Sequence, residues 1–138
     1  MLRGEVVVGQ LAMLAVERHY RDLQQAGKRG LVFSPAHAWH CIDFIQSHFV
    51  HIRGPLAGQP IVLDGWQLFW TAVFFGWRQQ ADGLRRFRTG YEEVARKNGK
   101  STWWGPIGAY LWMMDGEGGA EVYTIATTRE QAMAVFKP

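Results

Sequence analysis

The second half of the chain alternates two β-rich stretches with two helical ones, and this alternation constrains the fold most. The first β-rich stretch ends in Val94, and a helical pattern runs from Lys100 to Met114. Residues 120–126 (AEVYTIA) then predict a buried strand, and Thr128 with Gln131 predicts the start of another helix. Strand, helix, strand, helix is typical of α/β proteins, whose parallel sheets need cover on both faces. We therefore predict an α/β fold with a parallel sheet that is incomplete within this chain.

The first half of the chain is predicted to be helical. Its helix limits follow from apolar spacing and from residues that begin helices. The predicted limits are a first helix through Val7, Leu11, Leu14 and Ala15 to about Gln25, a second from Ser34–Pro35 to about Phe49, and a third from Asp64 and Gln67 through Phe74. The period changes after that point, and a turn at Asp82–Gly83 predicts a hairpin or two adjacent strands between Trp77 and Val94.

Composition indicates a globular chain and excludes several classes of protein. Hydrophobic residues make up 48% and charged residues 20%, which is neither disordered nor fibrous. The longest apolar stretch, around Trp66 to Trp77, is shorter than the roughly 20 residues that span a bilayer. The N-terminus lacks the pattern of a signal peptide, and the single cysteine, Cys41, is consistent with a reducing compartment. These features predict a cytoplasmic protein.

Basic residues are concentrated between residues 78 and 100. Seven basic and three acidic side chains between residues 78 and 100 give this segment a net charge of +4. Such a run is usually the solvated face of a hairpin, but it can also be a surface for the phosphates of a nucleotide or of DNA. Charge alone leaves both interpretations open.

The segment VARKNGKST contains the core of a phosphate-binding loop, placed between a β-rich stretch and a helix. Backbone amides at a helix N-terminus hold anionic oxygens, a lysine adds charge at the β- and γ-phosphates, and a serine binds Mg²⁺. Lys100 and Ser101 fit these two roles. The standard pattern requires glycine at position 94, where this chain has Val94. An ordinary helix start with Ser or Thr beside a lysine is therefore the alternative.

Two cations, Arg96 and Lys97, lie just before Asn98 and Gly99 of this loop. An arginine supplied within the loop can neutralise charge that develops on a γ-phosphate, as an arginine finger does in other ATPases. Arg96 is the candidate for this role. Its alternative is a surface arginine paired with Glu92 or Glu93.

The chain resembles the large terminase subunits of tailed phages that have a phosphate loop like ARKNGKST without the first glycine. The resemblance is carried by LDGWQLFWTAVFFGW, RRFRTGYEEVARKNGKST and DGEGGAEVYTIATTREQA, in the family's order, and covers most of residues 60–138. Residues 5–58 are similar to the family's N-terminal helices more loosely. The resemblance implies an N-terminal helical region at 1–58, followed at 59–138 by the first part of a P-loop ATPase domain of the additional-strand type.

By this resemblance the phosphate loop binds ATP and Mg²⁺. The implied nucleotide-binding residues are Gln67, Lys97, Asn98, Gly99, Lys100, Ser101 and Thr102, with Ser101 (or Thr102) on the metal and Arg96 as the catalytic arginine. Trp103 and Trp104 depart from the small or aliphatic residues of the family, which leaves the packing of this helix in question.

Gln67 has two possible roles. In the family a glutamine that follows an aromatic residue reads the edge of adenine, and a Gln amide can donate and accept at once, as adenine requires. Gln67 also lies three residues after Asp64 and can complete a capping box. The resemblance favours adenine, with capping as the alternative.

The resemblance also implies a motor that uses ATP to package double-stranded DNA into a procapsid, as an oligomeric ring with the small terminase subunit and the portal protein as partners. The acidic residues for Mg²⁺ and water activation, and the nuclease carboxylates, would lie beyond Pro138, so these 138 residues alone are not expected to hydrolyse ATP. The alternatives are another P-loop enzyme, such as a helicase-like ATPase or a small kinase, and a non-catalytic module that binds DNA or a partner.

Histidine and tryptophan clusters are interpreted as structural. Four histidines and Cys41 fall between residues 37 and 51, but their spacing lacks the paired ligands that close a tetrahedral metal site. His37, Cys41 and His48 are predicted to line a helix face with Phe44 and Ile45. Trp66, Trp70 and Trp77 are predicted to be core residues, with base stacking as the less favoured role.

Overall fold

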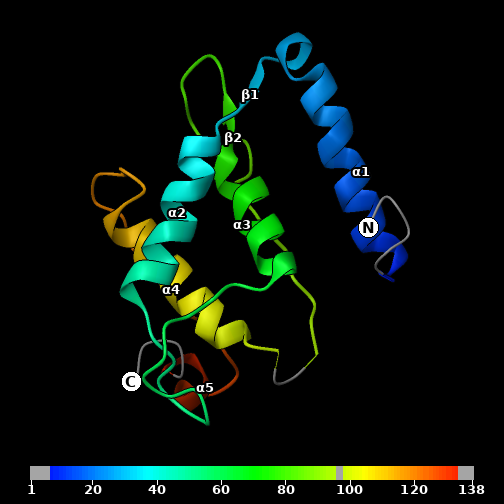
Figure 1. Cartoon of the computed structure of the whole chain (residues 1–138). Helices are drawn as coiled ribbons and strands as arrows, with labels where there is room; N and C mark the ends of the chain where they lie inside the picture. Colours follow the sequence, from blue (N-terminus) through cyan, green and yellow to red (C-terminus); the bar gives the residue numbers. More distant parts are fainter. Residues whose placement is uncertain (1–6, 96–97, 134–138) are drawn as a thin grey trace.

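The computed structural model describes residues 7–95 and 98–133, which form a mixed fold of helices and short strands (Figure 1). The elements in chain order are α1 (Gln10–Gln25), the 3-10 helix η1 (Gly27–Arg29), β1 (Leu31–Phe33), α2 (Pro35–His48), α3 (Gly65–Gly76), β2 (Trp77–Gln79), α4 (Lys100–Met113) and α5 (Arg129–Met133).

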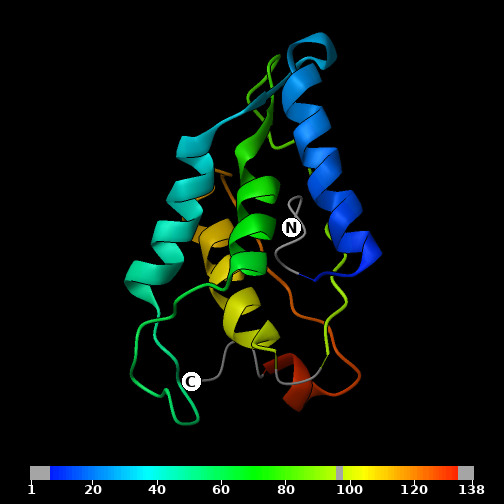
Figure 2. The ribbon, with the colours of Figure 1, turned by 45° about the vertical axis from the view of Figure 1, so that its right-hand side comes forward.

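Helices α2, α3 and α4 pack together, and α1 stands on the other side of α3. Figures 1 and 2 show α2 beside α3, with α4 crossing behind them, while η1 and β1 lead from the end of α1 to α2. No helix in the described ranges is long and apolar enough to cross a membrane.

The predicted starts of α2 and α3 are confirmed, because each depends on residues close in the sequence. The backbone N–H of His37 donates to the Ser34 hydroxyl, and Pro35 occupies the first turn of α2. At α3 the backbone N–H of Asp64 donates to Gln67 Oε1 at 2.9 Å, as part of a capping box. The predicted end of α1 at Gln25 is also confirmed.

The core between α2, α3 and α4 is rich in aromatic side chains. Trp103 is fully buried, and its indole N–H donates to the buried Thr71 hydroxyl at 3.1 Å. Trp66 and Trp70 both meet the Trp103 ring edge-on, at centroid distances of 5.2 and 5.0 Å. The predicted core role of Trp66 and Trp70 is confirmed, and Trp103 packs without difficulty as a central residue of the fold. Trp77 is fully buried in a second cluster with Leu31 and Val73.

The Trp104 indole, on the adjoining face of α4, donates to the Glu92 carboxylate. This hydrogen bond ties the stretch before the phosphate loop to α4. Both tryptophans that depart from the family pattern therefore have a structural role.

The prediction of a parallel sheet is wrong for the described part of the chain. Its only sheet is an antiparallel pair, in which β1 lies beside β2 with Leu31 opposite Gln79 and Phe33 opposite Trp77. The predicted hairpin is confined to residues 77–86, where Arg78 bridges Arg85, Gln79 N donates to the Leu84 carbonyl and Arg86 N donates to the Trp77 carbonyl. Residues 86–95 form no strand.

The predicted strand at 120–126 is also wrong, because these residues form neither a strand nor a buried segment. Tyr123 is 76% exposed and Ile125 is 94% exposed, whereas Val122 and Thr124 are half-buried. Exposed and half-buried residues alternate along this segment, but a strand needs a neighbouring strand to pair its backbone. The described ranges offer no such neighbour to this segment.

The basic segment is neither a solvated face nor, for most of its arginines, a free surface for phosphates. Arg86 donates to the buried Asp22 of α1 at 2.6 Å, and Arg29 pairs with the same carboxylate. Arg85 lies 3.1 Å from the buried carboxylate of Asp115, and Arg78 lies 3.9 Å from it. These arginines join α1 and the end of α4 to the β2 region.

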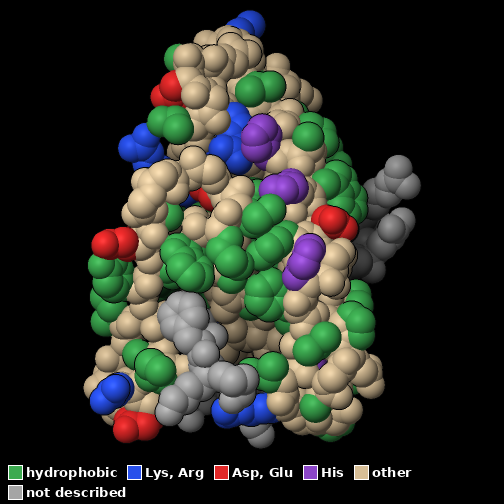
Figure 3. Space-filling model, turned by 90° about the vertical axis from the view of Figure 1, so that its left-hand side faces the viewer, with side chains coloured by type: hydrophobic (Ala, Val, Ile, Leu, Met, Phe, Trp, Pro, Cys, Tyr) green, Lys and Arg blue, Asp and Glu red, His purple; other side chains and the backbone are tan. Residues whose placement is uncertain are grey.

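The histidines do not form a metal centre among the described residues, in which no group of three or more His, Cys, Asp or Glu could hold an ion. Figure 3 shows histidine side chains spaced apart along one face of the molecule, between apolar side chains. His48 stacks on Phe44, and His40 is hydrogen-bonded to the Tyr110 hydroxyl at 2.9 Å. These histidines pack on the helical core, as the sequence predicted for His48.

Candidate functional site

The start of α4 differs from the starts of α2 and α3. Gly99 is its N-cap residue and has the left-handed backbone conformation, with φ of 69°. Its carbonyl accepts the first helical hydrogen bond from Trp103 N at 3.0 Å, but no side chain among the described residues caps the helix. The N–H groups of the first turn are therefore available to an anion, which the helix dipole favours at this end.

Ser101 and Thr102 lie inside the first turn of α4 and do not cap it. The alternative that this segment is an ordinary Ser/Thr helix start is thus wrong, because glycine occupies the cap position. Only a residue without a Cβ adopts φ near 69° at low cost. The Ser101 side chain is exposed at the surface, and Thr102 is half-buried.

Lys100 folds back over the segment that precedes the loop. Its Nζ donates to the backbone carbonyl of Val94 at 2.6 Å and to that of Ala95 at 3.0 Å. An ammonium group has three donors and no acceptor, so these carbonyls hold it at the mouth of the loop. Phosphate oxygens would compete for the same donors.

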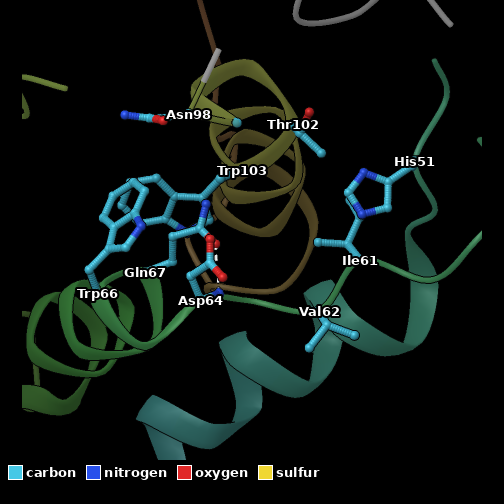
Figure 4. A pocket seen from close by; sticks show the side chains of 10 residues that line it. His51, Ile61, Val62, Asp64, Trp66, Gln67, Asn98, Thr102 and Trp103 are labelled. Carbon is cyan, nitrogen blue, oxygen red and sulfur yellow. Dashed lines mark hydrogen bonds between the residues drawn. The ribbon is translucent and has the colours of Figure 1, made fainter. Parts of the chain in front are cut away.

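A cavity of about 370 Å³ opens beside the start of α4 (Figure 4). Its size is near the lower end of the range of ligand sites, about 300–1,000 Å³. Three parts of the chain line it: the loop and first turn of α4, the start of α3, and the segment between α2 and α3. The lining residues are His51, Ile61, Val62, Asp64, Trp66, Gln67, Asn98, Gly99, Thr102 and Trp103.

Gln67 lies beside the phosphate loop, although the two are far apart in the sequence. Its side-chain Nε2 is 3.7 Å from the point where a Cβ on Gly99 would stand. Gln67 Oε1 accepts from Asp64 N, so the capping role is confirmed. An amide oxygen has a second lone pair, and Nε2 has two donors, so capping leaves Gln67 able to donate and accept again. The two roles are compatible.

The structure brings together four of the predicted nucleotide-binding residues. Gln67, Asn98, Gly99 and Thr102 share the cavity. Lys100 and Ser101 adjoin it in the first turn of α4 without lining it. The predicted catalytic Arg96 and the predicted ligand Lys97 lie outside the described residues.

Sequence reasoning missed the wall formed by His51, Ile61 and Val62. His51 was considered only as a member of the histidine cluster, and the other two belong to a stretch without a helix or strand pattern. These residues reach the cavity because the segment between α2 and α3 folds back on itself, with Val50 bridged to Pro60. Only this long-range return reveals them.

The donors at the start of α4 fit a magnesium nucleotide better than a metal held by protein alone. Magnesium keeps several waters and is usually bound by substrate phosphates and one or two protein oxygens. The exposed hydroxyl of Ser101 in the first turn is a suitable oxygen. The residues present at the helix start therefore fit a divalent cation that arrives with a nucleotide.

Comparison with known proteins identifies a family for the part of the chain that contains this site. Neither the curated proteins nor the solved structures include one that matches the chain. Residues 65–138, more than half of the chain, match the family model of the terminase large subunit ATPase domain. The matched range begins with α3 and includes Gln67 and the whole phosphate loop. The chain therefore belongs to the terminase large subunit ATPase domain family.

Proposed function

We propose that this chain binds Mg-ATP in the cavity beside α4, with the phosphates at the helix start and the adenine at Gln67. The strongest support is that Gln67 and Gly99 lie next to each other in the lining of one cavity. Gln67, whose amide can donate to and accept from a base, lies at the same cavity as a helix start without a side-chain cap, although the two are far apart in sequence. The family match supplies the activity, ATP hydrolysis by a terminase ATPase domain.

Each residue at the helix start has a chemical role in this proposal. The free N–H groups of the first turn receive phosphate oxygens, and Gly99 lets the backbone approach them closely. Lys100 exchanges the carbonyls of Val94 and Ala95 for phosphate oxygens. Ser101 holds the magnesium ion, which neutralises charge on the phosphates when bound. Asn98 and Thr102 complete the lining next to the loop.

Arg96 is proposed as the catalytic arginine of the loop, with Lys97 as a further contact to the nucleotide. Their order before Asn98 and Gly99 supports these roles. A cation at the γ-phosphate acts mainly on the rate, because charge develops there in the transition state.

The proposal extends to the whole protein, which uses ATP hydrolysis to package double-stranded DNA into a procapsid. Its partners are then DNA, the small terminase subunit and the portal protein, in an oligomeric ring. The N-terminal helical region at 1–58 precedes a P-loop ATPase domain of the additional-strand type that begins at 59–138. Membership of the terminase family supports this extension.

Calorimetric titration of the chain with Mg-ATP tests the binding site. We expect the wild-type chain to bind and Lys100→Ala to lose binding without unfolding. Lys28→Ala is the matched control, because Lys28 is an exposed lysine in η1, away from the cavity. Equal heats for wild type and Lys100→Ala would overturn the assignment of the phosphate site.

The two roles of Gln67 can be separated by two substitutions. Gln67→Glu keeps an oxygen that accepts from Asp64 N but loses the amide donor, whereas Gln67→Ala loses both. The readout is the ratio of the affinities for ATP and GTP, which a uniform repulsion of phosphates does not change. Loss of ATP preference in both variants supports adenine reading. Preference retained in Gln67→Glu would show that the amide donor does not read the base.

A further inference from the structure

We propose that His51 forms the wall of the nucleotide site on which the face of the base packs. This inference rests on the proposed ATP site and adds a residue that lies outside the family match at 65–138. Figure 4 shows the His51 ring directed into the cavity from the side opposite Gln67 and Trp103. The base would present one edge to the Gln67 amide and one face to the His51 imidazole.

The backbone around His51 is held by a short return of the chain. His51 N donates to the Gln59 carbonyl at 2.8 Å, and its own carbonyl accepts from Gly58 N at 2.7 Å. Beyond them, Ile61 N donates to the Phe49 carbonyl at 3.0 Å. These hydrogen bonds fix the position from which the ring enters the cavity, so the wall is built before a ligand arrives.

The His51 ring differs from the other histidine rings of the chain. Each of the other rings has a hydrogen-bond partner. These pairs are His19 with Trp77, His37 with Ser34, His40 with Tyr110, and His48 with the Phe44 carbonyl. Within residues 7–95 and 98–133, no hydrogen bond, ion pair or ring contact engages the half-buried His51 side chain. A partly buried ring that faces a cavity without a partner is suited to contact a ligand.

The neighbours of His51 suit the flat face of a base. Ile61 is only 5% exposed and provides an apolar floor, while Val62, at 76% exposed, stands at the rim. Proteins hold bases by stacking them on aromatic or apolar side chains and by hydrogen bonds to their edges. Stacking tolerates every base, because each has a π-face. His51 is therefore expected to set the affinity for any nucleoside triphosphate, and Gln67 to set the preference among bases.

Calorimetry of the full chain with two probes, Mg-ATP and magnesium tripolyphosphate, tests this inference. His51→Ala should weaken Mg-ATP binding about tenfold and leave tripolyphosphate binding unchanged, because the second probe has no base. His51→Phe, which keeps a ring, should restore most of the ATP affinity. His48→Ala is the control, since His48 is a neighbouring histidine that does not line the cavity.

The outcomes separate this inference from the proposed function. If the wild-type chain binds both probes and His51→Ala binds ATP as tightly as wild type, the His51 wall is wrong and the site stands. An equal loss for both probes would also overturn it, because the effect would then lie in the phosphates or the fold. Failure of His51→Phe to recover affinity would exclude the stacking role. If wild type and Lys100→Ala bind neither probe, the proposed function itself has failed.

Discussion

The aromatic core and the phosphate loop meet at the first turn of α4, and they are built in different ways. In the core, Trp103 is fully buried and its indole N–H is satisfied by Thr71. Only a few residues earlier, residues 91–95 form no strand, and Gly99 holds a left-handed conformation. The core groups have partners that no ligand can replace, whereas Lys100 holds two backbone carbonyls that phosphate oxygens can displace.

This difference indicates that the helices are placed by packing, whereas the start of α4 has no side-chain cap among the described residues. One helix serves both regions: α4 anchors its Trp103 face in the core and presents its N-terminus to the cavity. Substitutions in the core should therefore act on stability. Substitutions in the loop should act on binding and have smaller effects on stability than those in the core.

Trp103→Ala should have the largest effect on stability. It removes a fully buried side chain, opens a cavity among Trp66 and Trp70, and leaves the Thr71 hydroxyl without its donor. We expect the free energy of unfolding to fall by about 3–5 kcal/mol, measured by denaturant titration. Trp112→Ala on the same helix is the control, because Trp112 is 62% exposed and should cost less than about 0.5 kcal/mol. Similar losses for both would contradict the central role of Trp103.

Asp22→Asn should have the next largest effect on stability, and it tests whether the packed region extends to α1. Asp22 is 2% exposed and accepts hydrogen bonds from Arg86 and Arg29, so the free energy of unfolding should fall by about 2–3 kcal/mol. Asp43→Asn, an exposed aspartate on α2, is the control. An unchanged free energy of unfolding in Asp22→Asn would show that these ion pairs do not hold α1.

The same carboxylate predicts an acid dependence. Burial alone would raise the pKa of Asp22, but hydrogen bonds and charge from Arg86 and then Arg29 outweigh it and lower the pKa below its ordinary value of 3.8. The contribution to stability is therefore fully present above about pH 4 and is lost as the pH falls through the lowered pKa. Denaturant titrations between pH 7 and pH 2 should show wild type losing this advantage over Asp22→Asn at the acid end.

Sequence reasoning succeeded where the determining residues are neighbours. Ser34 and Asp64 start helices through contacts within one turn, so the limits of α2 and α3 could be predicted. The strand at 120–126 could not, because alternation specifies a face but the pairing strand must come from elsewhere. The partners of the basic segment could not be predicted for the same reason, since its counter-ions Asp22 and Asp115 are distant in the sequence.

The residues of the candidate site also differ in whether a local sequence motif reveals them. The phosphate loop and Gln67 have local motifs, and the structure places both at one cavity. His51 has no motif, and it reaches the cavity only through the backbone return that bridges Val50 and Pro60. The sequence therefore pointed to Gln67 and the loop before α4, and it missed the wall formed by His51, Ile61 and Val62.

Gly99→Ala tests the loop, and it should have a moderate effect on stability. A Cβ at φ of 69° costs about 1–2 kcal/mol, and here it would also stand 3.7 Å from Gln67 Nε2, at the cavity. Gly83→Ala is a matched control, because Gly83 has φ of 71° and open space around it. Both variants should lose similar stability in denaturant titrations, but only Gly99→Ala should weaken Mg-ATP binding. Equal affinities in the two variants would place the nucleotide away from Gly99.

Lys100→Gln should have the smallest effect on the stability of the free chain, and it separates the two regions most directly. Its ammonium contacts two carbonyls at a partly solvated site, where water or the glutamine amide can replace it, so the loss should be below about 1 kcal/mol. Ligand binding stabilises a folded chain in proportion to RT ln(1 + [L]/Kd), about 2.7 kcal/mol at a hundred times Kd. Wild type and the exposed-lysine variant Lys28→Gln should show this gain when Mg-ATP is added at that level, and Lys100→Gln should not. If Lys100→Gln instead destabilised the free chain as much as Trp103→Ala, the lysine would belong to the core, and the division between packed helices and exchangeable loop would be wrong.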